Sequence, residues 1–288
     1  KDQVLFFINR RGFAPYVLCK KCLNVFTCPR CSINLVFHKN KKILLCHYCG
    51  YNTKLNRCMR KIFVGWDSRE PIAYEVCKYS IQKHSPTAMV NPLKQDLMRE
   101  LGLYWRPIDK KASTEFTFTR FFTPMLAGFE DWVLFCDSDF IFTTDIEELF
   151  KKADDKYAIM CVKHDYTPKN TRKMDGQVQL QYPRKNWSSC MLFNAGHEKN
   201  KILTPDLLNH QSALFLHRMQ WLDDDLIGEL SCEWNWLAGW YEEPEDGKPK
   251  AIHYTEGGPW FDDYRDCEYA DVWNQYHKEY NGFTNGKH

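Results

Sequence analysis

Two carboxylates one residue apart, Asp137 and Asp139, directly follow the apolar run Trp132–Cys136. A run of this kind is typical of a buried strand, and open α/β sheets bind ligands where their strands end. At a strand end both carboxylates can reach one divalent cation, which would hold a diphosphate. An ordinary acidic loop is the alternative, but the apolar run Phe140–Phe142 after the pair favours a site over a solvated surface.

A second group with chemical potential is the sequence from His253 to Trp260, which contains Gly257 and Gly258. Glycines let backbone amides approach phosphate oxygens. We expect His253 to join Asp137 and Asp139 as a ligand of one metal ion at a nucleotide-sugar site. Oxygen ligands with one imidazole favour manganese, with magnesium as the alternative. Such an ion would act as a Lewis acid on a leaving diphosphate.

The start of the chain differs in composition from the rest. Residues 1–60 contain 12 of the 39 Lys and Arg but only one of the 37 acidic residues. Residues 1–58 also contain seven of the 13 cysteines, six of them in the Cys-x2-Cys pairs Cys19/Cys22, Cys28/Cys31 and Cys46/Cys49. Each pair places two thiolates on one tight turn, and two such turns complete a tetrahedral zinc site.

Disulfides are the weaker alternative for these cysteines. No signal peptide opens the chain, and no apolar run reaches the roughly 20 residues that span a bilayer. The six cysteines after residue 58 occur singly, and we expect them to be reduced thiols. These features predict a cytoplasmic protein, with the inner face of the membrane as a second possible location.

Residues 3–15 and the following cysteines, through Cys46-His47-Tyr48-Cys49, resemble the zinc-binding segment of the replication-restart helicases of the PriA family. The resemblance implies two zinc sites, one of them formed by Cys28, Cys31, Cys46 and Cys49. Cys19, Cys22 and Cys58 would belong to the other, which is one ligand short because Lys61 stands at the eighth position. A complete site contributes on the order of 10 kcal/mol to the folding of so small a segment.

A basic segment of this type could bind DNA through cations in and beside the cysteine pairs, namely Lys20, Lys21, Arg30, Lys39, Lys41 and Lys42. The chain contains no G-x-x-x-x-G-K-[ST] phosphate loop, which a helicase needs for ATP hydrolysis. Met59 precedes a basic pair and an apolar strand, as at the start of a bacterial reading frame. We therefore expect a PriA-like zinc-binding fragment over residues 1–58, joined without a flexible linker to a second protein over residues 59–288.

From residue 61 on, strand and helix patterns alternate. Aromatic residues at helical spacing, Phe118, Phe121 and Phe122, predict a core face. Trp234, Trp236 and Trp240 with Asn235 form an aromatic cluster that we also expect mainly in the core. We expect strands over residues 61–64, 87–90, 132–136, 157–162, 190–193 and 251–254, helices over 71–84 and 117–126, and a further helix that begins at Thr204-Pro205.

This order resembles the GT-A fold of retaining, family 8-like glycosyltransferases over residues 61–275. The resemblance implies an α/β fold with a mixed sheet flanked by helices, here preceded by a small cysteine-rich, zinc-ribbon-like segment. It implies a nucleotide site at Gly65, Trp66 and Asp67, and a donor-side helix that contains Arg120. It also implies a metal motif at Asp137, Ser138 and Asp139, an acidic motif over residues 223–228, and a metal and phosphate motif over residues 253–260. The family usually carries a lysine where this chain has Gly258.

The residues and the resemblance together predict a glycosyltransferase of the hexosyltransferase type. It would move a sugar from a nucleotide-sugar donor, a UDP-sugar, to a glycan or lipid-linked acceptor with retention. Asp224 stands where a nucleophile or oxocarbenium stabiliser would lie, and the alternative is that Asp223 or Asp225 fixes sugar hydroxyls instead. We expect Arg120 to pair with the donor phosphate or with Asp137.

The segment over residues 184–189 combines cations, an amide, an indole and hydroxyls. We expect it to bind the donor sugar or the acceptor through Lys185, Asn186, Trp187, Ser188 and Ser189. A surface loop with a half-buried tryptophan is the alternative. Two other functional classes are compatible with the sequence: a DNA-binding zinc module of the replication-restart type, and a protein that keeps the fold but has no activity.

Overall fold

The computed structural model describes two compact units. One comprises Lys1–Arg60 with Pro86–Met89, and the other Lys61–Ser85 with Val90–His288. The residues described are 5–6, 17–19, 26–28, 30–31, 33–38, 41, 43–54, 60–108, 112–165, 184–241 and 249–285. No helix within these ranges is long and apolar enough to cross a bilayer.

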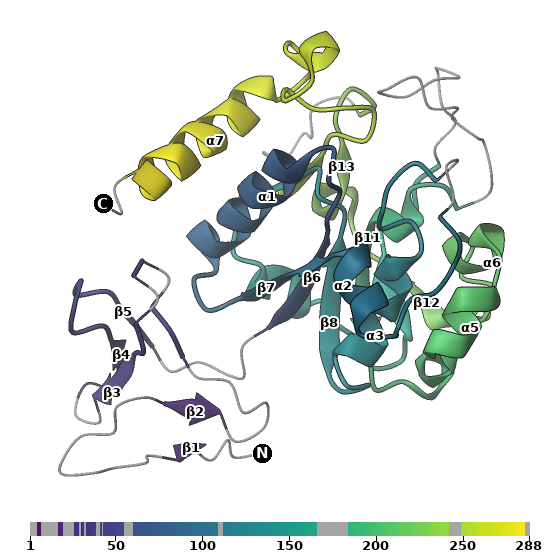
Figure 1. Ribbon diagram of the computed structural model, residues 1–288, viewed down its shortest axis with the longest axis horizontal. Coiled ribbons are helices and arrows are strands. Elements are labelled where there is room, and N and C mark those ends of the chain that lie inside the picture. Colours follow the sequence, from purple (N-terminus) through teal and green to yellow (C-terminus); the bar gives the residue numbers. More distant parts are fainter. Residues whose placement is uncertain are drawn as a thin grey trace. The chain divides into compact units, whose positions relative to one another are not determined.

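The larger unit is built on a six-stranded mixed sheet with the order β12–β10–β11–β8–β6–β7 (Figure 1). Strand β8 runs parallel to β6, and β10 runs parallel to β12, whereas β11 is antiparallel to both of its neighbours. Mixed pairing of this kind was expected from the sequence. The strands are β6 (Lys61–Gly65), β7 (Met89–Leu93), β8 (Trp132–Cys136), β10 (Ile159–Cys161), β11 (Cys190–Asn194) and β12 (Ile227–Glu229).

A second, three-stranded sheet positions the end of β8. Its strands are β9 (Phe140–Phe142), β13 (Trp236–Leu237) and β14 (Ala251–His253), in the order β13–β14–β9. Strand β14 is antiparallel to β9, with His253 opposite Phe140. Because Phe140 follows Asp139 directly, this register brings His253 close to the acidic pair.

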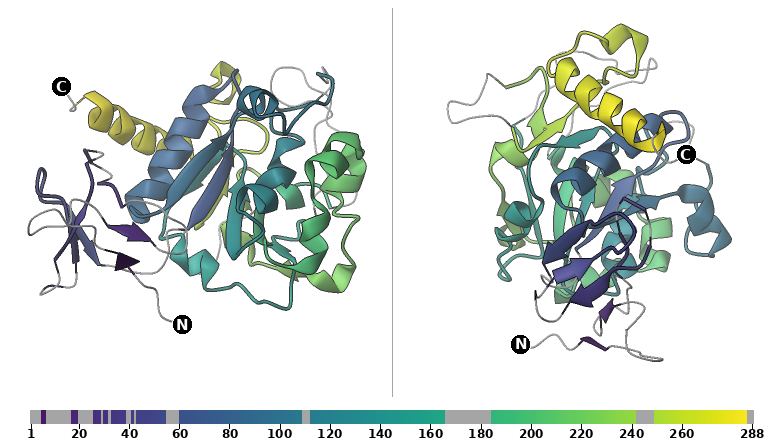
Figure 2. Two further views of the ribbon diagram at one scale, coloured as in Figure 1. Left: turned by 60° about the horizontal axis from the view of Figure 1, so that its bottom comes forward. Right: turned by 90° about the vertical axis from the view of Figure 1, so that its left-hand side faces the viewer.

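Helices α1 (Pro71–His84) and α7 (Ala270–Asn285) lie side by side in both views of the larger unit (Figures 1 and 2). Val76 of α1 and Trp273 of α7 share a buried cluster with Ile141 and Ile252. Lys83 Nζ also lies 2.6 Å from Glu279. The remaining helices are α2 (Gln95–Glu100), α3 (Thr123–Leu126), α4 (Glu147–Phe150), α5 (Pro205–His210) and α6 (Ala213–His217).

The structure differs from the sequence-based expectation at residues 117–126, where we predicted one helix. It has a short 3₁₀ turn, Thr119–Phe122, followed by α3. Pro124 explains the break, because it has no N–H for the carbonyl of Arg120 and its ring disfavours a continuous helix. The Thr123 hydroxyl donates to that carbonyl instead, over 2.8 Å. The predicted core face is nevertheless present, because Phe118, Phe121 and Phe122 are all buried.

The second strand also lies later than predicted, at Met89–Leu93 rather than residues 87–90. Residues 86 and 87 form a turn after α1, so the strand starts only after the chain has reversed. The other predicted strands and the helix over residues 71–84 are present, with ends that differ by up to two residues. Thr204 caps α5 as expected, because its side chain accepts a hydrogen bond from the Leu207 amide.

The smaller unit contains a three-stranded antiparallel sheet of β3 (Val36–His38), β4 (Ile43–Leu45) and β5 (Asn52–Lys54). A two-stranded antiparallel pair, β1 (Leu5–Phe6) and β2 (Leu18–Cys19), precedes it. The unit has its own small core, formed by Val17, Phe26, Leu35, Leu44, Cys28 and Cys46.

Candidate functional site

The structure brings together the three predicted metal ligands of the larger unit. Asp137 and Asp139 follow β8, and His253 ends β14. One ligand atom from each side chain lies within 4.8 Å of the others. His253 Nε2 is 3.4 Å from Asp139 Oδ2. The group therefore combines two carboxylates and one imidazole at the end of a central strand.

The chemistry of this group fits a divalent cation. Asp139 is 9% exposed, and its Oδ1 has no hydrogen-bond partner in the described part of the chain. A buried carboxylate oxygen is unfavourable unless a donor or a cation compensates it. Carboxylates with one imidazole suit Mn²⁺ or Mg²⁺. Asp137, Asp139 and His253 could therefore hold such an ion.

Arg120 is a buried cation next to the predicted metal ligands. Its Nη1 lies 2.8 Å from Asp137 Oδ1 and donates to the Ser188 carbonyl over 2.9 Å. The guanidinium carbon lies 5.2 Å from the ring centroids of both Phe116 and Phe135. Of the two partners predicted for Arg120, the one observed is Asp137, whose charge it compensates and whose orientation it fixes.

His253 makes a second contact, with Asn235, through its other nitrogen. His253 Nδ1 lies 2.9 Å from Asn235 Oδ1, and Asn235 Nδ2 donates to Ser189 Oγ over 2.9 Å. Ser189 Oγ in turn donates to the Asn186 carbonyl over 2.6 Å. Sequence analysis placed Asn235 only in a core aromatic cluster. The one signal that could have singled it out is an amide between two buried tryptophans, Trp234 and Trp236.

The predicted substrate segment, residues 185–189, forms several hydrogen bonds to other parts of the protein. The Trp187 indole donates to the His164 carbonyl over 3.0 Å, and Ser188 Oγ lies 2.7 Å from His217 Nδ1. Lys185, Ser188 and Ser189 are buried, and Asn186 has a left-handed φ of 66°. The segment helps to position the predicted metal ligands. Its role in binding a sugar stays a prediction.

Asp67, predicted to contact the nucleotide, is fully buried and hydrogen-bonded within the protein. It accepts from Arg69 Nε at 2.9 Å, from Arg69 Nη2 at 2.7 Å and from the Glu115 amide at 3.1 Å. Burial alone would raise the pKa of the Asp67 carboxyl, but the hydrogen bonds from Arg69 and Glu115 outweigh it and lower that pKa. The carboxylate therefore fixes the loop after β6. Within that loop, Trp66 lies with its ring centroid 4.5 Å from Lys94 Nζ.

Glu70, which sequence analysis did not single out, connects this loop to the motif over residues 253–260. It is 5% exposed and accepts a hydrogen bond from Trp260 Nε1 over 3.0 Å. Burial, and then the charge of Asp139, raise the pKa of Glu70 to about 8. No sequence motif marks this residue, because its role arises only when two distant segments meet.

The two glycines of the motif are required by packing. Gly257 has a φ of 142°, in the region that favours glycine. A Cβ at Gly258 would lie 1.9 Å from the Trp260 ring. No side chain fits at position 258 with Trp260 in this place, which explains the absence of the lysine that the sequence resemblance led us to look for.

The two candidate catalytic carboxylates, Asp223 and Asp224, are largely exposed, at 77% and 86% for their side chains. Asp224 pairs with Arg184, and Asp223 lies 3.8 Å from Lys199. Neither joins the three-ligand group, as far as the described residues show. Arg184 also lines a cavity of about 630 Å³ with Phe215, Arg218, Gln220 and Leu222. The catalytic role of Asp224 stays a prediction.

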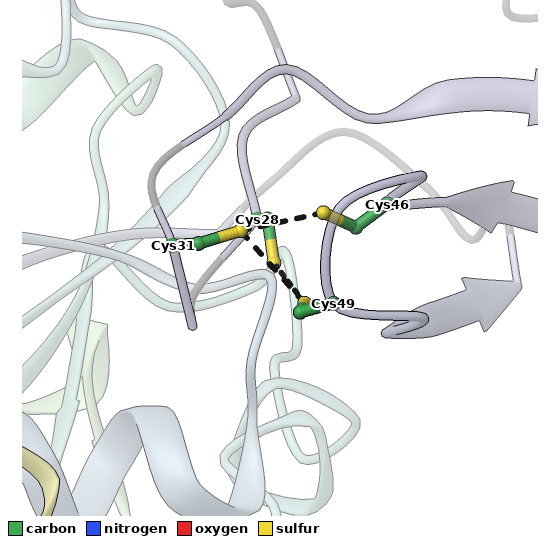
Figure 3. A group of neighbouring side chains, drawn as sticks. All are labelled: Cys28, Cys31, Cys46 and Cys49. Carbon is green, nitrogen blue, oxygen red and sulfur yellow. Dashed lines mark hydrogen bonds between the residues drawn. The ribbon is translucent and has the colours of Figure 1, made fainter. Parts of the chain in front are cut away.

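The smaller unit contains four converging cysteines, Cys28, Cys31, Cys46 and Cys49 (Figure 3). Their sulfur–sulfur distances include 3.3, 3.5 and 3.8 Å. Four sulfurs at about 2.3 Å from one zinc ion would lie about 3.8 Å apart, so the set fits a tetrahedral zinc site. Burial opposes ionisation of Cys46, but the backbone amides of Cys49 and Tyr48 outweigh it and lower the pKa of Cys46 to about 6, which favours the thiolate.

The incomplete second zinc site predicted from Cys19, Cys22 and Cys58 lies outside the described side chains. The six later cysteines are free thiols, as expected, and four of them, Cys77, Cys136, Cys161 and Cys190, are buried. The predicted PriA-like segment is confirmed by comparison with known proteins. Residues 28–54 match the family model of the PriA DNA helicase Cys-rich region domain.

One PriA relative is the replication restart protein PriA of Rickettsia typhi, 56% identical over 55 residues. The match covers 19% of this chain but only 8% of that protein. The likeness is therefore confined to a small part of a much longer helicase.

The fold of the larger unit is shared with solved glycosyltransferase structures. The apo form of the glycosyltransferase GlyE from Streptococcus pneumoniae superposes with a TM-score of 0.55 at 17% identity, over 80% of this chain and 63% of that chain. The bifunctional glycosyltransferase WbbM gives a TM-score of 0.55 at 16% identity, over 79% of this chain and 51% of that chain. The chain thus spans about half to two thirds of these proteins, and the expected GT-A type of fold is confirmed.

A much closer sequence relative covers the same part of the chain. Protein CDI of Arabidopsis thaliana is 53% identical over 225 residues, which make up 77% of this chain and 87% of that protein. Identity at this level over most of the relative's length establishes common descent. The chain therefore belongs to the family of Protein CDI.

Proposed function

We propose that the larger unit is a metal-dependent glycosyltransferase of the hexosyltransferase type, with a UDP-sugar as its donor. The observation that carries the proposal is the convergence of Asp137, Asp139 and His253 at the end of β8. A nucleotide sugar reacts by losing a diphosphate, so its enzyme must stabilise growing negative charge. The fold shared with GlyE and WbbM supports this function.

In this proposal the three side chains hold Mn²⁺, or Mg²⁺ as the alternative. The ion would supply Lewis-acid stabilisation of the leaving diphosphate. Arg120 compensates the charge of Asp137 and orients its carboxylate through their 2.8 Å ion pair. In the proposal the nucleotide and phosphates bind beside Gly65, Trp66, Asp67, Ser138, Gly257 and Gly258, where Asp67 acts by holding the loop after β6 rather than by direct contact.

The proposed outcome is retention, with Asp224 as the carboxylate that acts on the anomeric carbon or stabilises its positive charge. Asp224 pairs with Arg184, but its side chain is 86% exposed, so its carboxylate is accessible to a donor sugar. The acceptor in the proposal is a glycan or lipid-linked sugar, bound near residues 185–189. The proposed location is the cytoplasm, with the inner face of the membrane as the alternative where the acceptor is lipid-linked.

The test is release of nucleoside diphosphate from a panel of nucleotide sugars in the presence of Mn²⁺. The full chain is compared with the Asp137→Asn/Asp139→Asn double variant and with Asp206→Asn, which changes an exposed carboxylate. The proposal predicts release with at least one UDP-sugar by the full chain and by Asp206→Asn, and none by the double variant. Equal release by the double variant would contradict it.

A second function, DNA binding, is favoured for the smaller unit by its four-cysteine cluster and its match to the PriA Cys-rich region. Arg30 and Lys41 are exposed cations of this unit. If the unit binds DNA through such cations, the zinc-loaded chain should bind forked DNA with an affinity that falls steeply as salt is raised. Fluorescence anisotropy of labelled DNA measures this, and the absence of binding at low salt would exclude it.

A further inference from the structure

We infer that Asn235 is a positioning residue that decides which nitrogen of His253 is available to a metal ion. The inference rests on the proposed metal centre and adds a residue to it. Asn235 has no exposed surface, and it lies directly before β13, the strand that pairs with β14. Its amide is within hydrogen-bond distance of His253 on one side and of Ser189 on the other.

The directions of these hydrogen bonds follow from which groups can donate. The Asn186 carbonyl can only accept, so the 2.6 Å contact from Ser189 Oγ uses the hydroxyl proton. The Ser189 oxygen must then accept in its 2.9 Å contact with Asn235, so the NH₂ group of the amide faces it.

The amide oxygen of Asn235 consequently faces His253. An amide oxygen can only accept, so the proton of the 2.9 Å contact is on His253 Nδ1. In the neutral imidazole, Nε2 then has its lone pair free, and this atom lies 3.4 Å from Asp139 Oδ2. A lone pair that faces a carboxylate oxygen is repulsive unless a metal ion or a proton lies between them, and with the neutral ring protonated at Nδ1 it is Nε2 that is left to a metal ion.

The other contacts of His253 fix its plane but not its tautomer. The ring stacks on Phe140 with a centroid distance of 4.4 Å and an interplanar angle of 16°. The backbone carbonyl of His253 accepts from the Ala238 amide over 3.0 Å, which fixes the backbone at this residue. Neither contact distinguishes Nδ1 from Nε2. In the described part of the chain, Asn235 is the group that makes this distinction.

Ser189 connects the two sides of the metal centre. Its side chain accepts from Asn235, and its carbonyl accepts from the Asp137 amide over 2.8 Å. One residue therefore orients both the partner of His253 and the backbone of Asp137. These two contacts account for the burial of the polar residue Ser189, which is 3% exposed.

The experiment measures Mn²⁺ binding to the full chain, by the loss of the electron paramagnetic resonance signal of free Mn²⁺. Asn235→Leu removes both hydrogen bonds at similar volume and should weaken Mn²⁺ binding 10- to 100-fold, as a rough range. Asn235→Asp can still accept from Nδ1 and should bind within a few-fold of wild type. Asn200→Leu is the matched control, because Asn200 is equally buried and donates to Ala158 and Asn194 away from the metal ligands.

A second readout needs no metal. Nitrogen NMR of the histidine side chains in the metal-free chain should show His253 protonated at Nδ1 in wild type, Asn235→Asp and Asn200→Leu. In Asn235→Leu the Nε2-protonated form should appear. If Asn235→Leu does not fold, Asn235→Ala replaces it, because it also removes the amide oxygen that accepts from His253 Nδ1, and the Nε2-protonated form should again appear.

Unchanged Mn²⁺ affinity and an unchanged tautomer in Asn235→Leu, or in Asn235→Ala when that variant replaces it, would overturn the inference. A wild-type chain that binds no Mn²⁺ but keeps His253 protonated at Nδ1 would contradict the proposed function and support the orienting role of Asn235. The two failures are therefore distinguishable.

Discussion

At the residue scale, buried charge is the feature that most constrains the metal centre. Arg120 is 5% exposed and pairs with Asp137 between two aromatic rings. Removing one partner of a buried pair leaves the other charge uncompensated. We predict that Arg120→Gln lowers the free energy of unfolding of the metal-free chain by about 3–5 kcal/mol, measured by urea denaturation.

The matched control for this prediction is Arg265→Gln, because Arg265 forms an exposed pair with Asp262. An exposed pair contributes little, so this change should stay within about 0.5 kcal/mol of wild type. A similar loss of unfolding free energy in both variants would show that the buried Arg120 pair contributes no more to stability than an exposed pair.

His164 should make the free energy of unfolding fall as the pH is lowered. Burial lowers the pKa of His164 from 6.5 to about 3, and the neighbouring His253 acts in the same direction whenever its imidazole is protonated. As pH falls below 6.5 the unfolded chain binds a proton that the native imidazole does not, so this contribution to stability is present above pH 6.5 and is lost toward pH 3. His164→Gln should reduce the slope of unfolding free energy against pH in this window by up to about 1.4 kcal/mol per unit.

Denaturation series between pH 4 and pH 7 measure this slope, with His210→Gln as the control for the loss of an exposed histidine. A slope that does not differ between wild type and His164→Gln would show that the native imidazole takes up the proton. His164 Nδ1 lies 2.6 Å from the Tyr241 hydroxyl, so the variant keeps a polar group at that position.

The grouping of Asp137, Asp139 and His253 was predictable at this scale because residue type and sequence context carry the signal. Asp137 and Asp139 follow a clear strand pattern, and His253 lies beside two glycines. Asn235 and Glu70 could not be predicted, since each acts through a partner in a distant segment, namely Ser189 and Trp260. Asp67 illustrates the opposite case, because it follows β6 as the sequence pattern indicated, but its carboxylate is occupied by Arg69 and Glu115, and its contact with a nucleotide stays a prediction.

At the scale of elements, the end of β6 must come close to an aromatic ring. A Cβ at Gly65 would lie 2.6 Å from atoms of the Phe116 ring, and Phe116 is 1% exposed. Overpacking of a filled core typically costs about 1–3 kcal/mol. We predict that Gly65→Ala destabilises the larger unit by this amount, measured by chemical denaturation.

Gly282→Ala is the control, because nothing lies within 4 Å of a Cβ there and the residue is inside α7. It should stabilise the chain slightly, by up to about 1 kcal/mol, through helix propensity. If Gly65→Ala were as stable as wild type, the ring of Phe116 would have to move freely. Close packing would then not explain the glycine, and its predicted role beside a nucleotide would be the better explanation.

Most elements were predictable because apolar runs such as Trp132–Cys136 and capping signals such as Thr204-Pro205 are local. The 3₁₀ turn at Thr119–Phe122 was not, because aromatic spacing fits a helix while Pro124 breaks it. The three-stranded sheet was not predicted as a separate sheet either. Its strands contain only two or three residues each, and the pairing of β9 with β14 joins segments more than 100 residues apart.

At the scale of the whole molecule, the two units have different compositions and separate cores. All ten tryptophans follow residue 60, so tryptophan fluorescence reports on the larger unit alone. We predict that Cys46→Ser abolishes zinc binding at the four-cysteine cluster, which mass spectrometry of metal content measures. The unfolding midpoint followed by tryptophan fluorescence should stay unchanged.

Cys267→Ser is the control, since Cys267 is a lone free cysteine in the larger unit. It should leave the zinc content as in wild type. A lower fluorescence midpoint in Cys46→Ser would mean that the zinc segment stabilises the larger unit.

The central claim is that Asp137, Asp139 and His253 form one metal site that binds a nucleotide sugar through its diphosphate. The most direct measurement is calorimetric titration of UDP into the full chain, with and without Mn²⁺, for wild type and Asp137→Asn/Asp139→Asn. The claim predicts that UDP binds wild type tightly only when Mn²⁺ is present, and that the double variant loses this dependence. UDP binding of equal strength with and without Mn²⁺, or no UDP binding at all, would contradict it.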